Sequence, residues 1–81
     1  SATRELLQRA DQIYVLAASH QRAVRTMLPE AVTKTTLLDP TGADIADPYG
    51  GDLADYRRAR DQIAAAIAAR CADWRSRLTA R

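Results

Sequence analysis

Ile13-Tyr14-Val15-Leu16-Ala17 is a continuous apolar run near the start of this 81-residue chain. It contains β-branched and aromatic side chains, which are common in strands. A strand that is apolar without alternation is typical of a sheet covered on both faces. We therefore expect a buried strand here, with other elements packed on each side of it.

Helical patterns lie on both sides of this run. Thr3 is a suitable N-cap for a short helix over residues 4–10. Ser19 offers a second N-cap, followed by a helix over His20–Leu28 that Pro29 ends. The residues expected to face inward from this second helix are Ala23, Val24, Met27 and Leu28.

A second strand and a long helix follow. Lys34–Leu38 resembles a short strand, and Asp39-Pro40-Thr41-Gly42 is typical of a turn. Asp52, with Asp55 three residues later, is expected to cap a last helix of about 27 residues. The apolar stripe expected to face the core of that helix is Leu53, Tyr56, Ile63, Ile67, Cys71, Trp74 and Leu78.

The order helix, strand, helix, strand, loop, long helix predicts an α/β fold with a short parallel sheet and helices packed on it. The chain is short enough to form a single domain over residues 1–81, with 68–81 as a helical extension. Two strands leave open sheet edges and an uncovered apolar face. We therefore expect a partner, which is the rest of a longer chain, a second copy or another protein.

Composition excludes several classes of function. The formal charge is +2, and 12 basic and 10 acidic residues interleave without a basic tract, which disfavours nucleic acid. No apolar run approaches the roughly 20 residues that span a bilayer. One cysteine and one histidine cannot form an internal disulfide or a His/Cys metal cluster. We expect a soluble cytoplasmic protein without metal or cofactor.

Asp44-Ile45-Ala46-Asp47-Pro48-Tyr49-Gly50-Gly51-Asp52 is the stretch most suggestive of chemistry. Pro48 fixes its own φ and disfavours helical geometry at Asp47, so this acid is presented from an extended loop. An acid on a preset turn beside an aromatic is a candidate proton donor. Because Pro, Gly and Asp are ordinary turn formers, residue chemistry alone favours the other interpretation, a helix entrance that has no chemistry.

Several segments together resemble the low-molecular-weight protein tyrosine phosphatases, including the bacterial branch with its protein-arginine phosphatases. The matching segments are Thr3-x-x-Leu6-Leu7-x-x-Ala10-Asp11-x-Ile13-x-Val15, then Ser19-His20, then Asp47-Pro48-Tyr49-Gly50 before a long helix. The resemblance runs from Ala2 to about Ile67 and corresponds to the C-terminal half of a family member. It implies part of a flavodoxin-like unit.

The resemblance also implies roles for two residues. Asp47 would be the general acid that protonates the leaving oxygen of a phosphomonoester, and Tyr49 would form a wall of the substrate cleft. The substrate would be a phosphorylated protein, on tyrosine or arginine, or a small phosphomonoester. The family's nucleophile is a cysteine in a Cys-x5-Arg loop, which this chain lacks in the expected place, so the chain alone is expected to be inactive. The alternative is a non-catalytic interaction or dimerisation module derived from a phosphatase.

The segment Cys71–Arg77 matches Cys-x5-Arg literally, but it has no glycine, follows no strand and lies within the predicted helix. We therefore expect Cys71 to be a core residue and not a nucleophile. Many family members carry Met-Asp where this chain has Leu16-Ala17. This difference weakens any carry-over to Ser19 and His20, and His20 is expected to be a residue at a helix N-terminus.

Overall fold

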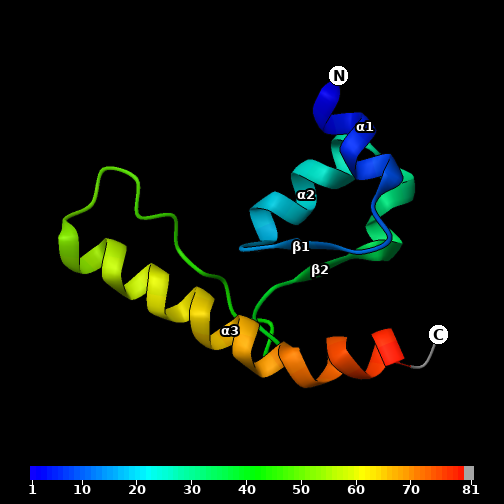
Figure 1. The fold of residues 1–81 in the computed structure, drawn as a ribbon. Helices are drawn as coiled ribbons and strands as arrows, with labels where there is room; N and C mark the ends of the chain where they lie inside the picture. Colours follow the sequence, from blue (N-terminus) through cyan, green and yellow to red (C-terminus); the bar gives the residue numbers. More distant parts are fainter. Residues whose placement is uncertain (80–81) are drawn as a thin grey trace.

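The structure is a computed structural model that describes residues 1–79. Its elements, in chain order, are α1 (Ala2–Arg9), β1 (Ile13–Val15), α2 (Ala18–Met27), the 3-10 helix η1 (Pro29–Lys34), β2 (Thr35–Leu37) and α3 (Leu53–Thr79). The strands form a two-stranded parallel sheet, so the predicted α/β class is confirmed. Helices α1 and α2 lie on one side of this sheet and α3 lies on the other (Figure 1).

The side chains of β1 alternate between the two faces of the sheet. Ile13 packs with Val24 and Leu28 beneath α1 and α2, whereas Tyr14 packs against the cluster on the α3 side. The expectation of a strand covered on both faces is therefore confirmed. Of the four residues predicted to face inward from α2, Val24 and Leu28 are buried. Ala23 and Met27 are exposed, so the prediction was wrong for these two.

Both N-caps expected in the first part of the chain were assigned to the wrong residue. Helix α1 begins one residue before Thr3, and the hydroxyl of Ser1 accepts from the amide of Arg4 at 3.2 Å. Helix α2 already includes Ser19, and its N-cap Ala17 has no side-chain oxygen to offer. Instead, the carboxylate of Asp44 accepts a hydrogen bond from the amide of Ala18 in the first turn of α2.

Helix α3 has the predicted length of 27 residues, and its cap is the predicted one. The amide of Asp55 donates to Oδ1 of Asp52 at 2.9 Å, and the amide of Asp52 donates to Oδ2 of Asp55 at 3.1 Å. This is a reciprocal capping box in which aspartate replaces the usual glutamate. No helix among residues 1–79 combines the length and the apolar character needed to cross a membrane.

The core-facing side of α3 differs from the predicted stripe. Ala59 and Ala66 are the buried residues of the helix, and Ile63 and Trp74 are half-buried beside them. The remaining stripe residues are exposed, namely Leu53, Tyr56, Ile67, Cys71 and Leu78. The small alanine side chains face the rest of the chain, and a sheet of two strands is too narrow to cover a broad apolar stripe.

Arg70 lies outside the predicted apolar stripe of α3, yet its side chain is part of the packed structure. Its Nε donates to the carbonyl of Leu38 at 2.6 Å, and its Nη2 donates to the carbonyl of Leu37 at 2.8 Å. The guanidinium lies 4.8 Å from the centroid of the Tyr14 ring. Arg70 therefore fastens α3 to the end of β2 and to β1, and the segment 68–79 includes part of the packed structure.

Candidate functional site

The chain that follows β2 passes across the carboxyl end of β1. A turn brings the amide of Gly42 to 2.9 Å from the carbonyl of Asp39, with Gly42 at a φ of +84°. The amide of Ile45 then donates to the carbonyl of Leu16 at 2.8 Å, and the Ile45 side chain is fully buried. Because ligands of open α/β sheets bind outside the carboxyl ends of the strands, this loop lies where a ligand site is expected.

Asp44 fixes the same loop to helix α2. Its Oδ1 accepts from the amide of Ala18 at 3.0 Å, so it satisfies one of the free amides of the first helical turn. The carboxylate charge also lies at the positive end of the helix dipole. Together with Ile45, this contact sets the position of the acid loop relative to the strands.

Asp47 and Tyr49 are presented by a compact turn. Oδ1 of Asp47 accepts from the amide of Tyr49 at 2.9 Å, an Asx-type bond within the loop. The amide of Gly51 donates to the carbonyl of Pro48 at 2.8 Å, and Gly50 has the φ of +78° that this turn requires. Asp47 is exposed, and the Tyr49 side chain is 88% exposed.

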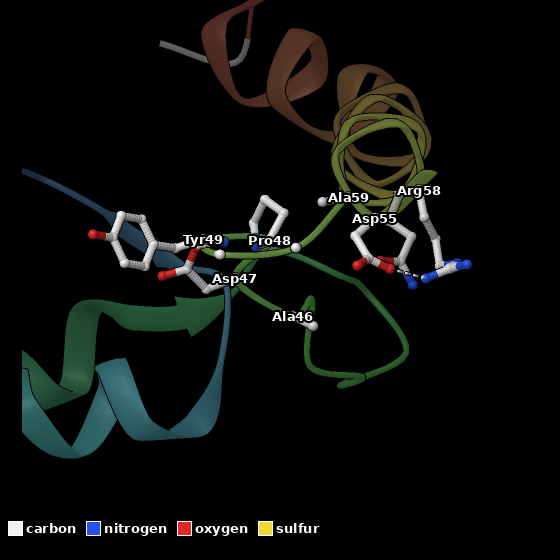
Figure 2. Close-up of a pocket in the computed structure, with 10 residues that line it drawn as sticks. Ala46, Asp47, Pro48, Tyr49, Asp55, Arg58 and Ala59 are labelled. Atoms are coloured by element: carbon white, nitrogen blue, oxygen red, sulfur yellow. Dashed lines mark hydrogen bonds and ion pairs between the residues drawn. The ribbon is translucent and has the colours of Figure 1, made fainter. Parts of the chain in front are cut away.

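The turn and the start of α3 enclose a shallow hollow of about 330 Å³. Asp47 and Tyr49 project from the loop, whereas the Asp55 and Arg58 side chains come from α3 itself (Figure 2). The Arg58 guanidinium pairs with Asp55 at 3.0 Å. The amide of Asp52, and then Arg58, lower the pKa of Asp55, which therefore stays anionic near neutral pH. Arg58 is already paired, so it is not a free anion ligand.

Cys71 is exposed, so the expectation that it belongs to the core was wrong. The rejection of Cys71–Arg77 as a phosphate loop agrees with the structure, because the whole segment lies inside α3. Its amides are engaged in helical hydrogen bonds and cannot cradle an anion. Arg77 pairs with Asp73 at 3.2 Å, one turn away on the same helix.

The structure places the two predicted site residues in one turn. Asp47 and Tyr49 lie together as the loop sequence suggested, and His20 lies exposed in the first turn of α2. Among residues 1–79, no three His, Cys, Asp or Glu side chains gather as metal ligands. Asp44 was missed as the residue that fixes the loop, because its partner Ala18 lies 26 residues away and leaves no local signal.

Comparison of the chain with models of protein families, with curated proteins and with solved structures finds no match in any of the three. The functional argument therefore rests on the geometry of the acid loop and on the sequence pattern described above.

Proposed function

We propose that this chain provides the general-acid loop of a cysteine-dependent phosphomonoester hydrolase of the low-molecular-weight phosphatase type. Asp47 is the acid, and Tyr49 flanks the substrate's leaving group. The observation that carries the proposal is the fixed, exposed position of Asp47 beyond the carboxyl end of β1. The α/β arrangement of the elements is compatible with part of a flavodoxin-like unit.

The hydrogen bonding of Asp47 suits an acid. One carboxylate oxygen accepts from Tyr49, and the other has no hydrogen-bond partner among residues 1–79. That second oxygen can hold a proton and deliver it to a leaving oxygen within reach. The Tyr49 ring, also exposed, offers a flat apolar surface to an aromatic leaving group.

The proposed step needs a thiolate from a second polypeptide segment. The thiolate attacks phosphorus and forms a sulfur–phosphorus bond while the bond from phosphorus to the leaving oxygen breaks. The proton of Asp47 passes to that oxygen, so the alcohol or phenol leaves neutral and Asp47 becomes a carboxylate. Without a nucleophile, Asp47 has no reaction to assist, and the chain alone is expected not to hydrolyse phosphomonoesters.

The test supplies the nucleophile and varies the leaving group. The full chain is co-expressed with a strand–Cys-x5-Arg–helix unit of a low-molecular-weight phosphatase, and hydrolysis of phenyl phosphate and p-nitrophenyl phosphate is measured. Asp47→Asn should slow phenyl phosphate about 10²–10⁴-fold, the usual contribution of a general acid. Nitrophenol is more acidic than phenol and leaves more easily without a proton. Asp47→Asn should therefore slow the hydrolysis of p-nitrophenyl phosphate much less.

Asp61→Asn is the matched control, because it makes the same chemical change at an exposed position of α3. It should leave both rates unchanged. Equal losses for both substrates in Asp47→Asn would show a structural effect, and unchanged rates would show that Asp47 is not the acid. Turnover by the chain alone that survives Cys71→Ala would contradict the need for a cysteine nucleophile.

The exposed apolar residues of α3 favour a second candidate function, that of a binding module. Exposed apolar patches on a folded chain mark interaction sites when they are contiguous. This candidate does not require chemistry at Asp47, and the surface involved is distinct from the acid loop.

A further inference from the structure

Two adjacent glycines, Gly50 and Gly51, join the acid turn to helix α3, and the fold needs each of them for a different reason. Gly50 has the positive φ that the turn requires, whereas the φ of Gly51 is not positive. An L-residue is therefore able to adopt the backbone conformation of Gly51. The reason for a glycine at this position lies instead in the atoms that surround it.

A Cβ atom at Gly51 would meet three atoms at less than contact distance. It would lie 2.5 Å from Oδ2 and 2.9 Å from Cβ of Asp55, and 3.0 Å from the carbonyl oxygen of Pro48. Ordinary van der Waals contact for a Cβ atom begins at 3.4 Å. The Cβ atom of Asp55 and the carbonyl of Pro48 move only with the backbone. A side chain at Gly51 would therefore push the turn and α3 apart by about half an ångström.

The helix side of this contact is held by several bonds. The carboxylate of Asp55 accepts from the amide of Asp52 at 3.1 Å, and it pairs with Arg58 at 3.0 Å. The amide of Asp55 in turn donates to the carboxylate of Asp52 at 2.9 Å. Rotating the Asp55 carboxylate away from a side chain at Gly51 would break the bonds that this carboxylate accepts. We therefore expect the first turn of α3 to keep its position and the acid turn to move.

The other end of the acid loop is also fixed. Ile45 is 1% exposed, and its amide donates to the carbonyl of Leu16 at 2.8 Å. A displacement at Gly51 therefore falls on residues 46–50, which lie between the two fixed ends. Asp47 belongs to this segment.

We propose that Gly51 is a positioning residue for Asp47, a role that rests on the function proposed above. By leaving space beside Asp55, Gly51 lets the acid turn lie against the start of α3. In this turn Oδ1 of Asp47 accepts from the amide of Tyr49 at 2.9 Å, and this bond orients the second carboxylate oxygen. A misplacement of 1 Å can slow an enzymatic step about 100-fold, so a shift of half that size should slow proton transfer about tenfold.

The first test follows the Asp47–Tyr49 bond in the 81-residue chain without a nucleophile. An amide proton that donates to a carboxylate changes its NMR frequency when that carboxylate gains a proton, so the Tyr49 amide reports the titration of Asp47. In Gly51→Ala the bond is displaced, and this change in frequency should fall at least about twofold. An unchanged response at Tyr49 would overturn the proposal.

Gly42→Ala is the matched control, because a Cβ atom there meets nothing within 4 Å. Gly42 has a φ of +84°, so alanine strains the backbone and lowers stability without a clash. The Tyr49 response should stay as in the wild type. An equal loss of this response in both variants would assign the effect to stability alone and overturn the proposal. Gly51 is exposed and outside both hydrophobic clusters, so Gly51→Ala should keep the fold, which circular dichroism checks.

The second test adds the Cys-x5-Arg unit and compares the two aryl phosphates. Gly51→Ala should lower kcat for phenyl phosphate about tenfold and kcat for p-nitrophenyl phosphate much less, because the better leaving group depends less on the acid. Gly42→Ala should leave the ratio of the two rates unchanged. Equal losses for both substrates in Gly51→Ala would overturn the positioning role. If Asp47→Asn slows neither substrate, the proposed function fails, whereas the Tyr49 amide still decides whether Gly51 sets the position of the Asp47 carboxylate.

Discussion

The indole Nε1 of Trp74 donates a hydrogen bond of 2.8 Å to the hydroxyl of Tyr14, which lies 60 residues earlier in the chain. The two rings meet edge to face, with centroids 5.4 Å apart. Arg70 lies over the same Tyr14 ring and donates to two carbonyls at the end of β2. This cluster, comprising Tyr14, Arg70 and Trp74, joins α3 to both strands.

The Tyr14–Trp74 bond predicts a measurable coupling. Tyr14→Phe and Trp74→Phe each remove one partner, and a double-mutant cycle should give about 1 kcal/mol of interaction free energy. Urea unfolding followed by circular dichroism provides the four free energies. Tyr56→Phe is the control, because this exposed hydroxyl makes no hydrogen bond within residues 1–79, and its stability should not change. Strictly additive single variants would contradict the coupling.

Arg70 should be among the most sensitive positions of α3. Arg70→Met retains an unbranched side chain but removes two charge-assisted hydrogen bonds, and we expect a loss of about 2–4 kcal/mol in the free energy of unfolding. Arg58→Met makes the same change at an exposed residue of the helix and should cost less than about 1 kcal/mol. Equal effects of the two variants would show that the contacts of Arg70 contribute nothing.

Asp44 should stabilise α2 from outside the helix. Asp44→Ala removes the acceptor of the Ala18 amide, and we expect a loss of about 1 kcal/mol, as for an N-cap. Asp44→Asn keeps an oxygen acceptor and should recover most of that loss. Hydrogen exchange at the first turn of α2 reports the effect locally, and unchanged protection in Asp44→Ala would contradict this role.

The lowered pKa values of Asp39 and Asp55 predict that the folded chain is less stable in acid. Bonds from the hydroxyl and then the amide of Thr41 lower the pKa of Asp39, and the amide of Asp52 followed by Arg58 lowers that of Asp55. A pKa below its unfolded value, 3.8 for both groups, adds stability that is fully present above that value. This contribution is lost as the pH falls through the lowered folded-state pKa values.

Urea midpoints measured from neutral pH down to pH values below 3.8 test this dependence. In Asp39→Asn the urea midpoint should fall less steeply as the pH is lowered, because asparagine does not titrate. The same fall of the urea midpoint in acid for the wild type and Asp39→Asn would contradict the contribution of Asp39 to stability.

Structural features that form between residues close together in the sequence were predictable from the sequence. The Asp52–Asp55 capping box and the turn at Asp39–Gly42 join residues three apart, and the uniform pattern of Leu53–Thr79 specifies a helix wherever that segment lies. The Asp47–Tyr49 turn was also predictable, because Pro48 restricts the backbone there and Gly50 permits the positive φ that the turn needs. Local sterics and short hydrogen bonds decide such features.

The tertiary structure decided which side of α3 is buried and which long-range contacts form. Arg70 reaches carbonyls 32 and 33 residues away, and Asp44 reaches an amide 26 residues away. Periodicity identifies an apolar side of a helix, but it cannot tell how wide a sheet that side will cover. A sheet of two strands leaves Ile67 and Leu78 uncovered, because the buried part of α3 is set by the surface it meets.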